Sequence, residues 1–387
     1  PEFARRYRIR SNGFALLLKS DPSTLFKASK AVPSERLEVG ESLERARPKL
    51  RKLDSLFYKR LAKLGRGPKR IRFTAGHQER SLRGLPNDPR PMRMQGLGTL
   101  LKRLNISSDP LGIADGLAQK VPDDTSAVVI AGPRRPMLQE EVAALQSYVQ
   151  SGGRLLVLVD SKGSGQRDDG LEPLLRAFGV QRVDGTVAST GHHMRSTYTK
   201  ADRTLVYSNT FSSHPSVSSA SRNSQRVAAV FARGTALERT PSVPRGLRVS
   251  FPVRSTSDFW SDLDGDFTRD TNEALKALHL VAAVSLPAKV SKTGNSTQGR
   301  VVIIGDGDFA TDALIKASGN ALIMLDSLRW LIGEEHLSGS VSSEEDVAIE
   351  HRKDEDRLWF YATTFGLPLP LLLLGLWVGR RRRGGGR

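Results

Sequence analysis

Three aspartates gather after an apolar run in the second half of this sequence, in the stretch GDGDFATD. Asp306, Asp308 and Asp312 follow the run 301–304, whose composition is typical of a strand buried on both faces. Carboxylates at the carboxyl end of such a strand can bind a metal ion or a polar ligand, because open α/β sheets bind ligands outside that edge. They can equally cap a helix that follows the strand. Both hypotheses stay open at this point.

A histidine and a glutamate occupy a comparable position in the stretch KRIRFTAGHQE. His77 and Glu79 come after a run that predicts a strand ending in a loop at Gly76. Such a pair can supply a general base or metal ligands. Combined with the aspartate cluster that begins at Asp306, it would suit a metal-assisted periplasmic hydrolase. A lone histidine is more often a structural hydrogen-bonding group, so that alternative stands beside the catalytic one.

An acidic segment, DLDGDFTRDTNE, repeats the spacing of the oxygen ligands in an EF-hand loop. The glycine that this loop needs at its sixth position is replaced by Phe267, and no helical pattern leads into the segment. The sequence therefore favours a solvated acidic loop and keeps calcium binding as the alternative. The candidate metal ligands are Asp262, Asp264, Asp266 and Glu273.

Several common catalytic motifs are absent from the sequence. There is no Cys, which excludes a disulfide framework, a thiolate metal site and a Cys nucleophile. There is no Gly-x-x-x-x-Gly-Lys-Ser/Thr phosphate loop and no Gly-x-Ser-x-Gly nucleophile elbow. We therefore expect no intrinsic ATP hydrolysis, no resident cofactor and no enzymatic activity.

The segment 127–160 carries the clearest fold signal. Two short apolar runs, 127–131 and 155–159, flank a helical stripe over 138–149, and this order predicts a βαβ unit with parallel strands. The run 301–304 would add a third parallel strand beside them.

The carboxyl ends of these strands would meet at one edge of the sheet. That edge would carry Gly132, Asp160 and Asp306, and the loop after Gly76 would deliver two more side chains to it. We therefore expect a single shallow ligand-binding pocket that contains His77, Glu79, Asp160, Asp306 and Asp308, with Gly132 at its edge.

The rest of the chain divides by composition. An Asn-Gly pair at 12–13 between two short apolar runs predicts a β-hairpin, and 42–64 has the pattern of a basic amphipathic helix. Residues 182–254 are rich in Ser, Thr and Arg, with short alternating runs. The expected organisation is a hairpin segment 1–41, an α/β extracytoplasmic domain 42–337 with a β-rich insertion around 182–254, a charged linker 338–357, a transmembrane helix 358–378 and an Arg-rich tail 379–387.

The uncharged run 358–378 predicts the membrane span. As a helix it would be about 31 Å long, enough to cross a hydrocarbon core of roughly 30 Å. Trp359 and Trp377 lie near its ends, where aromatic rings prefer the headgroup layer, and the cluster Arg380–Arg383 follows. Arginine clusters stay on the cytoplasmic side. We therefore expect an inner-membrane protein that contacts lipid through this helix, with its C-terminus in the cytoplasm and its bulk in the periplasm.

The formal net charge of +18 is concentrated in the first part of the chain, where residues 1–110 contain 26 Lys and Arg against 10 Asp and Glu. Such an excess could bind phosphates of nucleic acid. The charges are scattered through strand and helix patterns without interleaved aromatic residues, so we expect no nucleic-acid partner.

The chain starts PEFARRYRIR, without an apolar run that could direct export. We expect a fragment that lacks its N-terminal export segment.

Five segments together resemble one known family. They are KRIRFTAGHQE, AVVIAGPRRPMLQEEVAALQSYVQSGGRLLVLVD, GRVVIIGDGDFATDALI, GNALIMLDSLRWL and the terminal apolar run with its arginines. In this order the sequence resembles the GldG-type auxiliary components of ABC transporters, which belong with gliding-motility and uncharacterised ABC transport systems. The similarity runs through most of residues 66–383.

The resemblance implies a flavodoxin- or amidotransferase-like α/β fold, with a parallel sheet and flanking helices, of a type also found in an intraflagellar transport protein. It implies a periplasmic domain between two membrane spans, beside an ABC permease and a separate ATPase; the first span is missing here. The family offers no catalytic residues to assign. We therefore expect a non-catalytic accessory or ligand-binding subunit of an ABC-2-type transport or gliding-motility complex, with a saccharide or another small molecule as its ligand.

Overall fold

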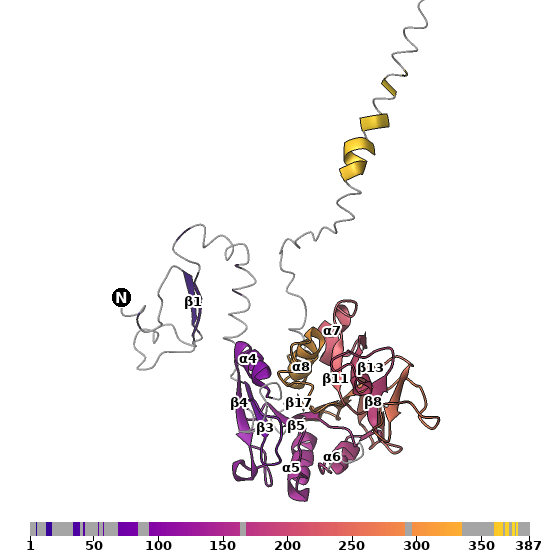
Figure 1. Cartoon of the computed structure of the whole chain (residues 1–387). Coiled ribbons are helices and arrows are strands. Elements are labelled where there is room, and N and C mark those ends of the chain that lie inside the picture. Colours follow the sequence, from indigo (N-terminus) through magenta and orange to yellow (C-terminus); the bar gives the residue numbers. More distant parts are fainter. Residues whose placement is uncertain are drawn as a thin grey trace, which may run out of the picture. The chain divides into compact units, whose positions relative to one another are not determined.

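The computed structural model describes residues 69–83, 93–162, 168–290 and 296–334. It also describes short stretches and single residues within 5–57 and 360–377. The chain divides into two compact units, Pro1–Ser340 and Val341–Arg387. The candidate site lies entirely in the first unit, whose described elements are shown in Figure 1.

A mixed sheet forms the centre of the first unit, in the order β10-β13-β15-β18-β6-β5-β3-β4. Neighbours from β18 to β4 are parallel, whereas β15, β13 and β10 are antiparallel. The sequence prediction of three neighbouring parallel strands is confirmed by β5, β6 and β18. The strands are β3 (Lys69–Thr74), β4 (Ile106–Leu111), β5 (Ala127–Ala131), β6 (Arg154–Leu158), β10 (Thr210–Phe211), β13 (Arg248–Arg254), β15 (His279–Ser285) and β18 (Arg300–Ile304).

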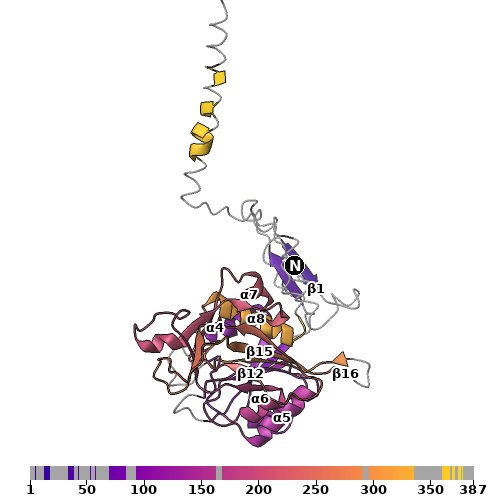
Figure 2. The same ribbon diagram turned by 90° about the vertical axis from the view of Figure 1, so that its right-hand side faces the viewer.

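Helices cover both faces of this sheet. In Figures 1 and 2, α4 (Gln95–Arg103) and α8 (Ser318–Leu331) lie on one face, and α5 (Gln139–Gln150) and α6 (Glu172–Ala177) lie on the other. Because successive side chains of a strand point to opposite faces, each central strand contributes to both cores. Alternate residues of the central strands thus pack into two separate apolar clusters: Val129, Leu156 and Val302 on the α8 face, and Val128, Leu155 and Ile303 on the α5 face.

The helix α5 begins and ends where the sequence predicts. The Glu141 carboxylate accepts a hydrogen bond of 2.8 Å from the backbone N–H of Leu138, which satisfies one of the free donors at the helix start. Gly152, with φ of +98°, follows the last turn. Because this helix connects β5 to β6, the two strands lie side by side and run parallel.

The region around 182–254 contains several strands, of which β10 and β13 extend the central sheet and β12 (Leu237–Arg239) pairs with β15. One expectation about the second half of the chain needs correction. The segment after β18 is a series of turns rather than a helix, and α8 begins only at Ser318. Side chains that bond to their own backbone favour turns over helix, and Asp306 Oδ1 accepts such a bond from the N–H of Asp308.

Smaller two-stranded sheets complete the first unit. β1 pairs with β2; the run 7–10, expected to form the hairpin with β1, lies outside the described residues. Most of the predicted helix 42–64, the whole linker 338–357 and the tail 379–387 also lie outside them. The remaining elements are β1 (Gly13–Leu17), β2 (Ser34–Glu38), β7 (Val180–Arg182), β8 (Thr186–Ser189), β9 (Leu205–Ser208), β11 (Ala229–Ala232), β14 (Phe259–Asp262), β16 (Lys289–Val290), β17 (Ser296–Thr297), α7 (Ser218–Arg222), η3 (Ile113–Asp115), η4 (Lys200–Thr204) and η5 (Pro215–Val217).

In the second unit, the described residues include a short π-helical stretch, η7 (Ala362–Gly366). Among all described residues of the chain, none of the helices has the length and apolar character that a membrane crossing requires.

Candidate functional site: a charged cleft at the carboxyl edge of the sheet

Arg80 is the centre of a charged group at the carboxyl ends of the parallel strands. Its side chain is only 6% exposed. Nε donates to Asp308 Oδ1 (2.8 Å), Nη1 donates to the backbone oxygen of Gly132 (2.8 Å), and Nη1 and Nη2 together bind both oxygens of Asp160. One guanidinium therefore joins the loops that follow β3, β5, β6 and β18.

Two glycines leave the space that this guanidinium occupies. Gly132 has φ of +57°, and a Cβ atom there would collide with Arg80 Nη1. A Cβ atom on Gly307 would collide with the same nitrogen and with Asp160. A side chain at either glycine would therefore displace Arg80, and at Gly132 it would add the strain of a left-handed backbone.

The ion pairs keep Arg80 charged despite its burial. Burial alone would lower its pKa, but the charges and hydrogen bonds of Asp160 and Asp308 raise the pKa above its ordinary value. Each of these two carboxylates keeps about a quarter of its side chain exposed, 24% and 23% respectively. A ligand in the cleft would thus meet carboxylate oxygens whose positions are fixed by a buried cation.

Asp306 lies behind this group and is 1% exposed. Its oxygens accept hydrogen bonds from the backbone N–H groups of Ala232 and Asp308, both at 2.7 Å. Burial, followed by the negative charge of Asp308, raises the pKa of Asp306 well above its ordinary value, although the two N–H donors oppose the shift. This carboxyl group connects the end of β11 to the turn after β18.

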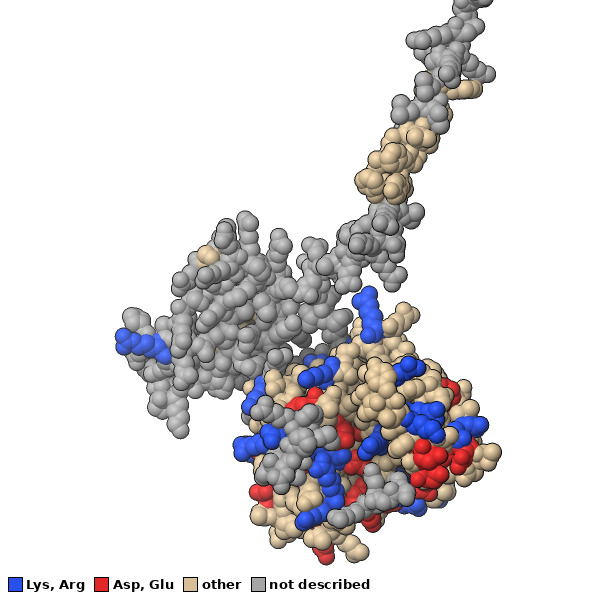
Figure 3. Space-filling model, viewed as in Figure 1, with Lys and Arg blue, Asp and Glu red and all other residues tan. Residues whose placement is uncertain are grey.

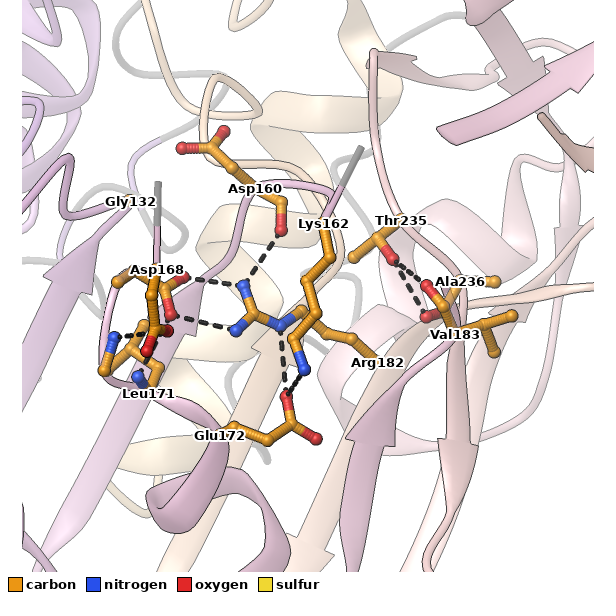
Figure 4. A network of polar contacts seen from close by, with 12 residues as sticks. Gly132, Asp160, Lys162, Asp168, Leu171, Glu172, Arg182, Val183, Thr235 and Ala236 are labelled. Atoms are coloured by element: carbon orange, nitrogen blue, oxygen red, sulfur yellow. Dashed lines mark hydrogen bonds and ion pairs between the residues drawn. The ribbon is translucent and has the colours of Figure 1, made fainter. Parts of the chain in front are cut away.

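Arg182 forms a second ionic group beside the first, shown in Figure 4. It binds both oxygens of Asp169 (2.6 and 2.9 Å) and donates to the backbone oxygen of Asp160 (3.1 Å). Glu172 accepts from Arg182 Nε (3.4 Å) and pairs with Lys162 (2.8 Å). Asp160 therefore contacts both arginines, Arg80 through its side chain and Arg182 through its backbone.

The two groups line one cleft with a volume of about 760 Å³. Most of its lining residues are polar, with five basic and five acidic side chains and no aromatic ring among the described lining residues. The lining residues are Gln78, Arg80, Pro133, Arg134, Asp160, Ser161, Lys162, Asp168, Asp169, Glu172, Arg182, Ala232, Arg233 and Asp308.

Two lining residues adopt a strained backbone. Gln78 has φ of +57° and Arg233 has φ of +53°. For residues other than glycine this conformation costs on the order of 1–3 kcal/mol and is concentrated at functional sites. Arg233 is exposed, and its side chain forms no ion pair or hydrogen bond with any residue that the structure describes. It is therefore a charged group at the cleft that a ligand can bind without breaking an existing contact.

His77 and Glu79 do not line this cleft, and the expected single pocket must be corrected in this respect. His77 is 7% exposed and Glu79 is 4% exposed. The two ring nitrogens of His77 face Glu79 Oε1 (3.3 Å) and Glu141 Oε2 (3.0 Å). Asp306 is buried as well, so the cleft keeps only Asp160 and Asp308 of the five residues. With both nitrogens engaged, this histidine resembles a structural group more than a catalytic base.

The acidic loop does not line this cleft, but its Glu273 lines a neighbouring pocket together with the cleft residues Glu172 and Arg182. Carboxylate oxygens of Asp262, Asp264 and Glu273 come within 4.8 Å of one another, whereas Asp266 is not part of this group. Backbone N–H groups already occupy the loop's carboxylates: Asp262 accepts from Gly265 and Phe267, and Glu273 accepts from Leu263 and Asp270. Hydrogen bonds within the loop thus account for the arrangement that resembles calcium ligands in the sequence.

The sequence patterns did not single out the two arginines that organise the cleft. Arg80 stands next to Glu79, and carboxylates predicted to meet at one sheet edge need a cation between them, which was an available signal. Arg182 gave no comparable signal, because its partner Asp169 is near only in the folded chain. A partly exposed pair, His192 Nδ1 and Asp258 Oδ2 (2.9 Å), was missed for the same reason.

Residues 68–326 match the protein family described as ABC-type uncharacterized transport system. The chain belongs to this family. The matched range contains every residue that lines the cleft. As a member of the ABC-type uncharacterized transport system family, the chain is an auxiliary component of an ABC-type transport system.

The similarity of this chain to solved structures is low. Among curated proteins no sequence matches it. The N-terminal domain of mmIFT52 has 18% identity and a TM-score of 0.47, covering 68% of this chain and 97% of that one. A ThuA-like protein from Bacteroides uniformis has 9% identity and a TM-score of 0.33, covering 68% and 90%. An exo-β-1,4-mannosidase from an Opitutaceae bacterium has 14% identity and a TM-score of 0.31, covering 74% and 37%. TM-scores this low support no conclusion about function.

Proposed function

We propose that this protein is a non-catalytic, ligand-binding accessory subunit of an ABC-2-type transport or gliding-motility complex, working beside a permease and a separate ATPase. Its membership of the ABC-type uncharacterized transport system family supports a role in such a transport system. The observation that carries the ligand-binding role is the cleft at the carboxyl edge of the parallel strands, where open α/β sheets bind ligands.

The lining of the cleft defines the class of ligand. Asp160 and Asp308 present fixed carboxylate oxygens, and Arg233 presents an exposed cation. Closely spaced acceptors and donors of this kind suit a ligand with many hydroxyl groups, because each hydroxyl both donates and accepts. A saccharide or a similar small polar molecule fits this description better than an apolar one.

We also propose that the protein is anchored in the inner membrane by residues 358–378, with its bulk in the periplasm. The uncharged run and the arginines that follow it support this topology. The anchor would keep the cleft on the same side of the membrane as the outer face of the permease.

A reporter fused after Arg387 tests the topology. We expect a reporter that works only in the cytoplasm to be active there, because the arginine cluster keeps the C-terminus inside. The matched control replaces Arg380, Arg381, Arg382 and Arg383 by Gln, which should weaken this preference. Activity of a periplasm-only reporter after Arg387 of the unchanged chain would contradict the proposed localisation.

Purification of the tagged full-length protein from membranes tests the partners and the ligand together. We expect a permease and a separate ATPase to co-purify. Denaturation of the preparation should release a polar small molecule, which mass spectrometry detects. Arg233→Glu should keep the partners and lose most of that molecule, since it reverses a charge inside the cleft. Arg245→Glu, at an exposed position outside the lining residues, should change neither. Absence of both transport proteins, or equal amounts of the molecule in the Arg233 and Arg245 variants, would refute the proposal.

A further inference from the structure

A second pocket lies apart from the cleft and has a different electrostatic character. Its volume is about 420 Å³, and it shares no lining residue with the cleft. Three of its side chains are permanent cations, one is a histidine, two are threonines and one is a tyrosine. The lining residues are Thr190, His193, Arg195, Tyr198, Thr199, Lys200, Asp202 and Arg203.

The acid in this pocket is fully occupied by its own loop. Asp202 is 4% exposed, and its carboxylate accepts hydrogen bonds from the backbone N–H groups of Ser196 (2.9 Å), Thr197 (2.9 Å) and Tyr198 (2.8 Å) and from the Thr197 hydroxyl (2.7 Å). These donors, led by the Thr197 N–H, lower the pKa of Asp202 to about 2. Its oxygens are therefore engaged by backbone N–H groups and a hydroxyl, and among the described residues Asp202 forms no ion pair with the three cations of the pocket.

The loop held by Asp202 presents a tyrosine in a strained conformation. Tyr198 has φ of +58° and is 84% exposed, so burial of its ring contributes little to the stability of the fold. A bulky residue with positive φ is uncommon and costs on the order of 1–3 kcal/mol. The four hydrogen bonds to Asp202, one of them from the Tyr198 N–H, thus hold the loop that presents this exposed ring at the pocket.

The three cations differ in their existing contacts. Lys200 Nζ donates to Thr268 Oγ1 (3.0 Å), and Arg203 Nη1 donates to the backbone oxygen of Phe267 (2.9 Å), so each keeps further donors. Arg195 is exposed, and within the described part of the chain its side chain has no hydrogen-bond or ion-pair partner. None of the acidic residues of the adjoining loop 262–273 lines the pocket.

From this combination we infer that the pocket is a second binding site, for the phosphate group of a polar molecule. An oxyanion can accept hydrogen bonds from several directions, which matches the guanidinium, ammonium, hydroxyl and phenol donors that line this pocket. The phosphate group belongs either to a soluble phosphate ester or to a phospholipid headgroup. This site is independent of the saccharide-type ligand proposed for the cleft.

Calorimetric titration of the full-length protein with inorganic phosphate and with a hexose phosphate tests the soluble ligand. Co-sedimentation with phosphatidylglycerol–phosphatidylcholine vesicles, against phosphatidylcholine alone, tests the headgroup. We expect saturable binding in one of these two arms. Arg195→Gln should weaken it about tenfold, the effect of losing one charge-assisted hydrogen bond. Arg245→Gln, which removes the same charge from an exposed turn elsewhere, should not weaken it.

Tyr198→Gly separates binding from folding. Glycine accepts the left-handed conformation without strain, so the melting temperature should stay unchanged or rise while binding weakens. Three results would overturn the site: no binding in either arm, equal weakening by Arg195→Gln and Arg245→Gln, or unchanged binding by both the Arg195 and the Tyr198 variant. Failure of the cleft experiment would leave this result unaffected, because Arg233 does not line this pocket.

Discussion

Arg80→Met should destabilise the folded domain by about 3 kcal/mol, the largest effect that we expect from a single substitution. Removal of one partner from a buried ion pair typically costs about 3–5 kcal/mol, because the other charge is left without compensation. Here Asp160 and Asp308 keep some contact with water, which places the effect at the lower end. Urea unfolding of wild type and variant measures the difference.

Matched variants show whether the charge or the shape of Arg80 matters. Arg80→Lys should lie between wild type and Arg80→Met, since lysine keeps the charge but cannot bind both oxygens of Asp160. Arg83→Met, at an exposed position three residues away, should stay within about 0.5 kcal/mol of wild type. Combining Arg80→Met with Asp160→Asn and Asp308→Asn should recover part of the loss and allows measurement if the single variant does not fold. A loss below 1 kcal/mol for Arg80→Met would contradict the role assigned to this ion-pair group.

Asp306→Ala should cost about 2 kcal/mol at acidic pH and less as the pH rises. The substitution leaves the partly buried N–H groups of Ala232 and Asp308 without their acceptor, which destabilises by roughly 1–3 kcal/mol. Because burial and the charge of Asp308 raise the pKa of Asp306 in the folded state, its contribution is fully present below the pKa of the unfolded chain, near 4. That contribution is lost as the pH rises through the folded-state pKa.

The measurement is the difference in unfolding free energy between wild type and Asp306→Ala across pH 4 to pH 8. Using the difference removes the contributions of other carboxyl groups with raised pKa values, such as Asp262 and Asp326. Asp184→Ala, at an exposed position, is the control and should give a small difference that does not depend on pH. A difference that grows with pH would show that the fold favours the charged form of Asp306, against this account.

The order of the central elements could be predicted from the sequence because their signals are local. The runs that form β5 and β6 are apolar and short, the helix between them has a 3.6-residue stripe, and Gly152 and Gly153 mark its end. Parallel strands with their carboxyl ends at one edge follow from this pattern. The position of Asp160 and Asp308 at one cleft follows from it too, since Asp160 stands two residues after the end of β6 and Asp308 four residues after the end of β18.

Only the tertiary structure decided which strand-end residues face solvent and what holds them. Asp306 stands two residues after β18, as Asp160 does after β6, and His77 stands three residues after β3. His77 and Asp306 are nevertheless buried, because Glu141 from α5 and the backbone of Ala232 supply their partners. The antiparallel extension through β15 and β13 could not be predicted either, since strand pairing between distant segments depends on packing rather than on local pattern.

The sequence by itself determined the family, through the resemblance of its segments to known members. It also determined the parallel core and the residue types available at its edge, because these depend on composition and spacing along the chain. The tertiary structure alone decided the charge organisation of the cleft and of the second pocket. Arg80 meets Asp308 across 228 positions of sequence, and Arg203 meets Phe267 across 64. Hydrogen bonds need donor–acceptor distances of about 3 Å, and the attraction between two charges weakens as they separate. Partners this distant in the sequence therefore acquire their roles only when the sheet and its loops bring them into contact.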